Sequence, residues 1–302
     1  MELRDIEYFA VVAEHGHLGR AAEALGLSTP ALSKSLRRLE KALQTKLVAR
    51  TPKGVELTAE GNALLSHVRP LRLSLQDVAR EIADLGQGRS GHLRLGSFPG
   101  PADYLLPTVC SAFLADAPKV TVTITVANNS ALVWALRNGE LDLILINMVA
   151  RPDENIVAEH LFDEELVVYS SVNHRLARRE RVEIADLAQE RWAFSALDAM
   201  PTKWVYHVFE NNGLAPPRAA LVSPLMPIRL RAIAASDLLG FSSRRSLRQV
   251  VPPLPLKEIP VKGLMWTRRV GLGYRRNAYL SPAARRFIEI LKTTAKEIAD
   301  KP

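Results

Sequence analysis

Cysteine is nearly absent, since Cys110 is the only one among 302 residues. A single thiol excludes an internal disulfide and the Cys-rich scaffolds of small secreted proteins. The chain also lacks an uninterrupted apolar run of about 18 residues, which a transmembrane helix needs. Its first residues, Met1 to Asp5, lack the apolar stretch of a signal peptide. We therefore expect a cytoplasmic protein without a membrane span.

The common catalytic motifs are absent as well. The sequence contains no HExxH metal motif, no GxSxG nucleophile elbow and no GxxxxGK[ST] phosphate loop. Residues 86–91 match GxGxxG, but they follow a helical pattern and precede a strand pattern, which reverses the order of a dinucleotide-binding loop. His15 and His17 have no further His or Cys nearby to complete a metal site. We expect neither catalysis nor a cofactor or metal.

Positive charge is concentrated in one short segment. The chain has 40 Lys and Arg against 32 Asp and Glu, a net charge of +8. Residues 20–54 alone hold eight basic and two acidic residues, and acidic residues on either side hide this surplus in longer windows. Such a segment is typical of a surface that binds a polyanion such as nucleic acid. An ordinary solvated helix face is the alternative.

Three short helices are predicted at the N-terminus. Apolar residues recur at helical spacing over residues 3–14, over 18–25 and from Leu32 to Leu43. Gly16 and Gly26 follow the first two helices, where glycine suits the left-handed end of a helix. Ser28 is the expected N-cap of the third helix, whose outer side is basic. Two helices joined by a short turn, the second basic on its outer face, predict a helix-turn-helix.

A β-hairpin is expected directly after these helices. Residues 47–50 and 55–57 flank a Thr-Pro-Lys-Gly sequence that suits a type I turn, and the basic tip of such a wing can enter a minor groove. The candidate DNA-binding residues are polar or basic side chains of the third helix and the wing: Thr29, Pro30, Ser33, Lys34, Arg37, Arg38, Arg50 and Lys53. Arg37, Arg38 and Lys53 are assigned mainly to phosphates, and the residues at the start of the helix to base edges.

A run of motif residues spans the helices and the hairpin. It comprises Arg20-Ala21-Ala22-Glu23-Ala24-Leu25-Gly26-Leu27-Ser28, Pro30-Ala31-Leu32-Ser33, Leu39-Glu40, Leu47, Arg50 and Leu57-Thr58-Ala59-Glu60-Gly61. In these residues and their spacing, residues 1–90 resemble the DNA-binding part of the LysR-type transcriptional regulators. Thr29 stands where the family often has Gln, and His17 and Gly19 stand where it often has Ser and Thr. The resemblance therefore implies a winged helix-turn-helix over residues 1–58 but not a particular DNA sequence.

A long helix with a heptad seam is predicted next, over residues 59–90 together with a hinge. From Thr58, the expected N-cap, to Leu85 the apolar residues recur at alternating steps of four and three. The seam consists of Leu64, Val68, Leu71, Leu75, Val78 and Ile82. Such a seam needs a partner helix, which we expect from a second copy of the chain; packing on its own domain is the alternative. The family resemblance also implies dimerisation through this helix and assembly into a tetramer.

Residues 91–302 alternate between strand and helix patterns. Strands are expected at 92–97, 119–126, 142–147, 165–170, 191–194, 219–222, 238–242 and 265–274. Helices are expected at 103–115, 129–138, 203–212, 226–235 and 281–299. This alternation predicts an α/β fold with largely parallel sheets. The resemblance implies an effector domain like type 2 periplasmic binding proteins, with one lobe formed by 91–162 and 267–302, the other by 163–266, and crossing strands near 161–165 and 264–268.

An effector site is expected between these lobes. Ligands of open α/β sheets bind beyond the carboxyl ends of strands, where helix N-termini favour anions. The candidate residues follow predicted strands or open predicted helices: Ser97, Phe98, Pro99, Gly100, Asn128, Asn129, Asn147, Ser195, Thr202 and Met226. Each of these is also an ordinary turn or cap residue.

Together these features predict a sequence-specific, DNA-binding transcriptional regulator that is not an enzyme and is controlled by a small molecule. The expected partners are double-stranded promoter DNA, further copies of the chain and an effector, which the basic surplus of residues 91–302 favours as an anion. RNA polymerase is a further candidate partner. The alternative is a ligand-binding or enzymatic α/β protein with an accessory DNA-binding module.

Overall fold

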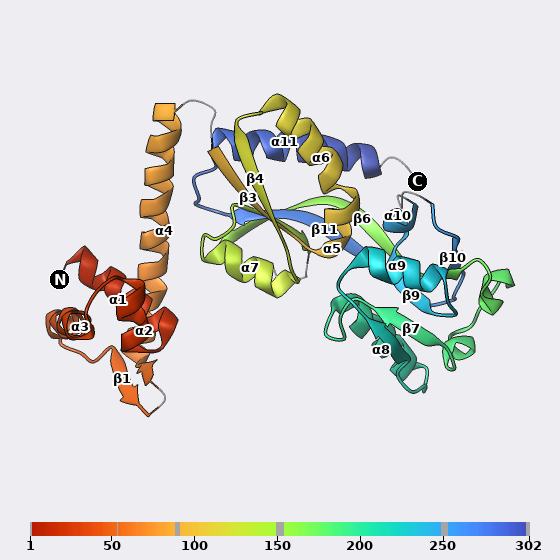
Figure 1. Ribbon diagram of the computed structural model, residues 1–302, viewed down its shortest axis with the longest axis horizontal. Coiled ribbons are helices and arrows are strands. Elements are labelled where there is room, and N and C mark those ends of the chain that lie inside the picture. The colour runs from red at the N-terminus through yellow and green to blue at the C-terminus, as the bar shows by residue number, and fades with distance from the viewer. Residues whose placement is uncertain (1, 53, 88–90, 149–153, 249–252, 300–302) are drawn as a thin grey trace. The chain divides into compact units, whose positions relative to one another are not determined.

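The computed structural model describes residues 2–52, 54–87, 91–148, 154–248 and 253–299. The chain divides into two compact units, Met1–Gly86 and Gln87–Pro302 (Figure 1). Within the described ranges, no helix combines the length and the apolar character needed to span a membrane.

The first unit is a winged helix-turn-helix followed by a long helix. Its elements are α1 (Leu3–His15), α2 (Leu18–Ala24), α3 (Thr29–Leu43), β1 (Val48–Thr51), β2 (Gly54–Leu57) and α4 (Ala59–Gln87). Gly16 ends α1 in the left-handed conformation with φ 59°. The side chain of Ser28 accepts a hydrogen bond from the Ala31 N–H at 3.3 Å, and that of Thr58 accepts one from the Gly61 N–H at 3.0 Å. These local signals set the helix ends where the sequence predicts them.

Two backbone contacts hold the wing against the turn between α1 and α2. The Val55 N–H donates to the carbonyl of Gly16 at 2.8 Å. A Cβ atom on Gly54 would lie 2.3 Å from the same carbonyl, and Gly54 has φ 137°, so a larger residue there would be strained as well as crowded. The wing is thereby fixed next to the starts of α2 and α3.

The long helix α4 changes its environment along its length. Leu65 and Val68 are buried in the apolar core formed by α1, α3 and β1, and Leu64 packs against the same core. The later seam residues Leu71, Leu75, Val78 and Ile82 are exposed. The predicted seam is therefore divided into two parts. Its first turns complete the core of the DNA-binding domain, whereas its outer part, from Leu71 to Ile82, is exposed to solvent.

The second unit contains one mixed sheet with helices on its faces. Its strands are β3 (Gly91–Ser97), β4 (Val120–Val126), β5 (Leu143–Asn147), β6 (Ile156–Ser171), β7 (Arg191–Phe194), β8 (Arg218–Val222), β9 (Leu239–Ser243), β10 (Leu256–Ile259) and β11 (Trp266–Arg275). Its α-helices are α5 (Pro99–Tyr104), α6 (Leu106–Asp116), α7 (Asn129–Arg137), α8 (Met200–Asn211), α9 (Met226–Ala234), α10 (Arg244–Arg248) and α11 (Pro282–Ala299), with 3-10 helices η1 (Arg175–Arg178) and η2 (Ile184–Leu187).

The strand order of this sheet is β4-β3-β5-β11-β6-β9-β7-β8, with β10 also paired to β6. Strands β3, β4 and β5 are parallel, as are β7, β8 and β9. The long strands β6 and β11 join the two halves in antiparallel pairing. Each half has its own apolar core, one around β3, β5, α6, α7 and α11, and one around β7, α8, β9 and α9. We call these halves the first and second lobe.

Several details differ from the sequence-based expectation, and strand β10 was not expected at all. The two crossing strands are antiparallel to their neighbours, so the sheet is mixed rather than largely parallel. Strand β6 begins at Ile156, well before the predicted residue 165. The prediction missed its first part because acidic residues interrupt the apolar pattern there. The helix expected at 103–115 is two helices that meet at Leu105, since Pro107 lacks the N–H that a continuous helix would use.

Candidate functional site

A shallow groove lies in the DNA-binding domain between the start of α2, the first turns of α3 and the wing. Its volume is about 600 Å³, and it is lined by His17, Leu18, Thr29, Pro30, Ser33, Arg37, Thr51, Pro52, Gly54 and Val55. Thr29 and Pro30 are exposed at its rim, as is Lys34 on the same face of α3. The structure thus brings four of the predicted helix residues, Thr29, Pro30, Ser33 and Arg37, to one concave surface with the wing.

Two neighbouring arginines of α3 have different environments. Arg37 is exposed on the groove, with its Nη2 3.4 Å from the Ser33 hydroxyl. Arg38 contacts the buried carboxylate of Asp5, with its Nε 2.8 Å from Oδ2 and its Nη2 2.5 Å from Oδ1. The Arg38 guanidinium, assisted by the Ser35 hydroxyl, lowers the pKa of Asp5 despite its burial. Arg38 therefore ties α3 to α1, a role that the sequence pattern did not indicate.

The remaining DNA-binding candidates differ from one another in exposure and position. Ser33, expected to face outward, is 8% exposed and lies on the floor of the groove beneath Arg37. Arg50 is in β1, opposite Val55, and Lys53 lies outside the described residues. His17 was not expected in the site, but it lines the groove, and its Nδ1 accepts a hydrogen bond from the Gly19 N–H at 3.1 Å. The sequence did offer one signal for His17, because this residue stands where the family often has Ser or Thr.

The effector candidates of the first lobe lie at the carboxyl ends of adjacent strands. Ser97 ends β3; its buried hydroxyl donates to the Phe98 carbonyl at 2.9 Å, and its own carbonyl accepts the Ala127 N–H at the end of β4. Pro99 and Gly100 begin α5. These residues do gather at one edge of the sheet.

The side chains of Asn128 and Asn129 and the backbone of Asn147 have internal partners at this edge. The Asn128 side chain accepts a hydrogen bond from the Ala131 N–H at 2.9 Å and so caps α7. The Asn129 amide donates to the Asn147 carbonyl and accepts from the Asn147 N–H, both at 2.9 Å. These amides hold the start of α7 to the end of β5.

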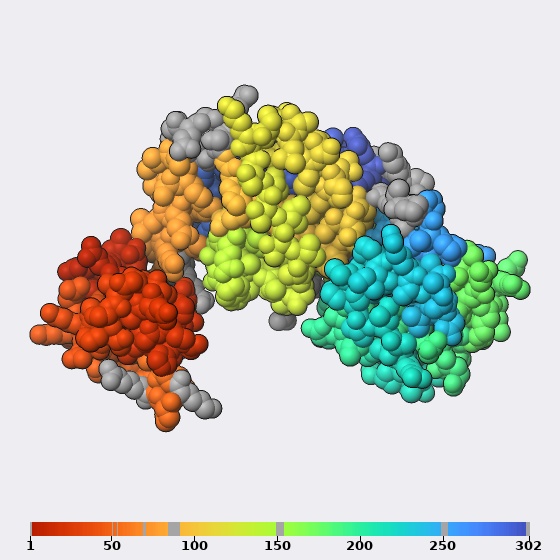
Figure 2. Space-filling model, viewed as in Figure 1, coloured from red at the N-terminus to blue at the C-terminus, as the bar shows by residue number. Residues whose placement is uncertain are grey.

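The candidates of the second lobe follow β7 and β8. Ser195 comes directly after β7 and is half-buried. Thr202, in the first turn of α8, is buried and donates its hydroxyl to the Ala196 carbonyl at 2.7 Å. Met226 is the first residue of α9 and is buried. Figure 2 shows a hollow in the surface of the second unit between the part that carries α6 and α7 and the part that carries α8 and α9.

A buried ion pair joins the two crossing strands. Glu164 of β6 and Arg268 of β11 are opposite in the sheet, with Nε 2.5 Å from Oε2. The Arg268 guanidinium also lies 4.5 Å from the centre of the Phe98 ring, and a Cβ on Gly100 would lie 2.8 Å from its Nη2. Arg268 of this pair therefore contacts Phe98 and Gly100 of the predicted effector site. The sequence signal for it was faint: opposite charges near the middle of two expected crossing strands.

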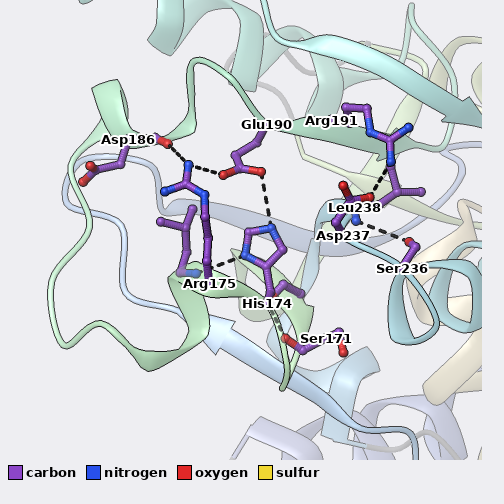
Figure 3. Close-up of polar contacts among 11 residues, drawn as sticks. Ser171, His174, Arg175, Asp186, Glu190, Arg191, Ser236, Asp237 and Leu238 are labelled. Carbon is purple, nitrogen blue, oxygen red and sulfur yellow. Dashed lines mark hydrogen bonds and ion pairs between the residues drawn. The ribbon is translucent and has the colours of Figure 1, made fainter.

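A second polar cluster surrounds His174 in the second lobe (Figure 3). The His174 Nδ1 accepts the Leu176 N–H at 3.2 Å, and its Nε2 lies 3.3 Å from the Glu190 carboxylate. Arg175 also contacts Glu190, and its Nη2 donates to the Asp186 carbonyl at 3.2 Å. Because these groups satisfy one another, the cluster stabilises the connection between β6 and β7. No group of three or more metal-ligating side chains occurs among the residues that the structure describes.

A winged helix-turn-helix joined to a two-lobed α/β domain defines a class of DNA-binding regulators that respond to small molecules. Two family models match the chain: "Bacterial regulatory helix-turn-helix protein, lysR family" over residues 3–62, and "LysR substrate binding domain" over residues 86–296. The chain belongs to the LysR family of bacterial transcriptional regulators.

Individual relatives agree with this assignment along the whole chain. The SDS degradation transcriptional activation protein of Pseudomonas sp. (strain ATCC 19151) is 31% identical over 288 residues, covering 94% of this chain and 93% of the relative. The regulator GbpR of Azospirillum brasilense is 27% identical over 297 residues, covering 98% and 87%.

Solved structures share the fold at lower identity. CbnR in complex with its target DNA has a TM-score of 0.61 at 22% identity and covers 97% of this chain and 100% of that chain. A full-length OxyR variant from Pseudomonas aeruginosa has a TM-score of 0.65 at 22% identity, covering 98% and 95%.

Proposed function

We propose that this LysR-family regulator binds promoter DNA through the groove between α2, α3 and the wing. The observation that carries this proposal is that the groove and the exposed side of α3 present Thr29, Pro30, Lys34 and Arg37 together. Arg37 and the wing contact phosphates, whereas Thr29, Pro30 and Lys34 reach base edges in the major groove. Arg38 contributes mainly by fixing α3 through Asp5.

The salt dependence of duplex binding tests this assignment. Arg37→Ala should weaken binding to all duplexes and reduce the slope of log affinity against log salt by about 0.9, the value for one lost phosphate contact. Lys41→Ala is the matched control, because Lys41 is an exposed cation of the same helix that does not line the groove. An Arg37→Ala slope equal to that of the control would reject the phosphate contact.

We propose further that the outer part of α4 pairs with the same part of a second copy. Leu71, Leu75, Val78 and Ile82 are large apolar side chains on one seam, and each is exposed in the single chain. Burial of such a seam against a partner helix is the arrangement of a coiled coil. Leu64 and Val68 support the pairing only indirectly, since they anchor α4 to its own domain.

The apolar cores support the proposed domain organisation. Residues 1–58 with the start of α4 form the DNA-binding domain, and the first and second lobes form an effector domain in which residues 91–162 and 267–302 face residues 163–266. We propose that a small molecule binds between the lobes, at the edge that carries Ser97 and the loop after it. A ligand that binds one arrangement of the lobes more tightly shifts the population of regulators towards it.

Thermal unfolding tests effector control without knowledge of the operator. A small molecule that binds between the lobes should raise the melting temperature of the wild type in proportion to the logarithm of its concentration above Kd. Ser97→Ala should reduce that rise, and an unchanged rise would place the ligand elsewhere.

A further inference from the structure

Among the residues that the structure describes, one buried cation of the second lobe makes no ion pair with a carboxylate. Arg229, in the first turns of α9, is 6% exposed. In the parts of the chain that the structure describes, no Asp or Glu oxygen lies within 4.0 Å of its guanidinium, whereas the equally buried Arg268 contacts Glu164. Removing a guanidinium from water is unfavourable unless acceptors or an anion offset the lost hydration. The surroundings of Arg229 therefore favour an added negative charge.

The contacts that Arg229 does make are to uncharged groups. Its Nη1 donates to the carbonyl of Ser223, and its Nη2 lies 3.2 Å from the sulfur of Met226, which is a weak acceptor. Burial lowers the pKa of Arg229, while the phenol of Tyr169 and the carboxylate of Asp103 act in the opposite direction. Asp103 is on α5 of the first lobe, so a negative charge of the other lobe acts on Arg229 without contacting it.

The position of Arg229 is fixed by the sheet behind it. Tyr169 is fully buried on β6, and a Cβ on Gly240 of β9 would lie 2.3 Å from its ring. The missing side chain at Gly240 thus leaves the space that the Tyr169 ring fills, and the phenol then faces Arg229. Because β6 is one of the two crossing strands, a ligand at Arg229 would act on an element that connects the lobes.

The apolar residues at the strand ends and at the start of α9 indicate the chemistry of the rest of the ligand. Large apolar side chains that are about half exposed lie at or after the carboxyl ends of the parallel strands β7 and β8, and the last two also flank Arg229 in the sequence of α9: Leu197, Met200, Val222, Leu225 and Ile228. The N-cap residue of α9, Leu225, provides no side-chain hydrogen bond to the first turn of the helix. A cation set among apolar side chains suits an organic anion with an apolar body rather than a sugar or an inorganic ion.

We propose that Arg229 binds the carboxylate of an amphipathic organic anion, and that the negative charge of Asp103, on α5 of the first lobe, opposes this binding. The inference rests on the proposed effector control and adds the chemical class of the effector. Ligand entry would exchange a thioether contact for a charge-assisted hydrogen bond, which is shorter and stronger.

Thermal unfolding of the full-length protein with matched probes tests the proposal. The probes are hexanoate and octanoate, each compared with its neutral amide. The carboxylates should raise the melting temperature of the wild type, and the amides should not. Arg229→Gln should weaken the apparent affinity for octanoate at least tenfold, whereas Arg231→Gln, an exposed arginine of the same helix, should leave it unchanged. Equal shifts with carboxylates and amides, an unaltered Arg229→Gln response, or no shift with any probe would overturn the assignment.

A second variant keeps the test decisive if Arg229→Gln does not fold. Asp103 is exposed, so Asp103→Asn preserves the core and removes the charge that competes with the ligand. Octanoate should bind this variant more tightly than the wild type, and equal or weaker binding would contradict the proposal. Duplex binding by the ligand-free wild type is measured in parallel: its loss would count against the regulator function, whereas its retention without any carboxylate effect counts against this inference alone.

Discussion

Leu75→Ala is expected to weaken self-association without altering the fold of the chain. Leu75 is 43% exposed on the outer part of α4. Since full burial of a leucine side chain contributes about 1.5–3 kcal/mol, burial of this exposed fraction contributes about 0.6–1.3 kcal/mol per chain. A symmetric contact doubles this value to about 1.3–2.6 kcal/mol per dimer, which is roughly a 10- to 80-fold change in the dissociation constant.

Sedimentation equilibrium over a range of protein concentrations measures that constant directly. Leu43→Ala is the matched control, because Leu43 is a 37% exposed leucine at the end of α3, away from the seam. The two variants should have similar melting temperatures at concentrations where all chains are monomeric. A Leu75→Ala dissociation constant within threefold of the Leu43→Ala value would refute the helix-pairing model.

A substitution of Val68 distinguishes pairing through the outer part of α4 from pairing along the whole seam. Val68 is 4% exposed and belongs to the core of the DNA-binding domain. Val68→Ala should therefore lower the free energy of unfolding of that domain, by about 1–3 kcal/mol for the deleted methyl groups and the residual cavity. If α4 paired along its whole length, the same variant would change the dimer constant as strongly as Leu75→Ala does.

Three further predictions concern stability. The Arg38 hydrogen bond is the main reason that the pKa of Asp5 is lowered in the folded chain. The stability that this gives is present above the unfolded pKa of about 3.9 and is lost as pH falls through the folded pKa. In acid unfolding curves, the stability advantage of the wild type over Asp5→Asn should therefore vanish. Gly54→Ala should destabilise the wing and weaken duplex binding in a mobility-shift assay, and normal binding would contradict the steric argument. Glu164→Gln leaves Arg268 buried without its charged partner, so urea unfolding should show a loss of about 3–5 kcal/mol; a loss below about 1 kcal/mol would show that the pair is dispensable.

Most of the architecture could be predicted because its signals are local. The helix ends at Gly16, Ser28 and Thr58 depend on residues within four positions, and each one occurs where the pattern indicates. The alternation in residues 91–302 likewise predicts almost every strand and helix. The part of β6 before residue 165 was missed because acidic residues interrupt the apolar pattern there.

The candidate site was harder to predict because its contacts are not local. Arg37 and Arg38 are adjacent and chemically identical, yet only Arg38 meets a buried carboxylate, 33 positions away in the chain. Leu75 and Val68 are likewise equivalent in the heptad pattern and differ only in what packs beside them. Periodicity tells which side of an element is apolar, but it does not tell which polar side chain finds a partner across the fold.

The same distinction separates two buried arginines of the effector domain, Arg268 and Arg229. Arg268 and Arg229 are both buried and both lie in apolar surroundings, so sequence pattern and exposure treat them alike. Arg268 is paired with Glu164 within the sheet and therefore has little to gain from a further anion. Arg229 has a carbonyl, a thioether and a phenol around it, and the carboxylate that acts on its pKa, that of Asp103, belongs to the other lobe. A ligand's negative charge would lower the free energy of the second arrangement far more than that of the first. For this reason Arg229, rather than the polar strand ends that already satisfy one another, is the residue expected to set the charge of the effector.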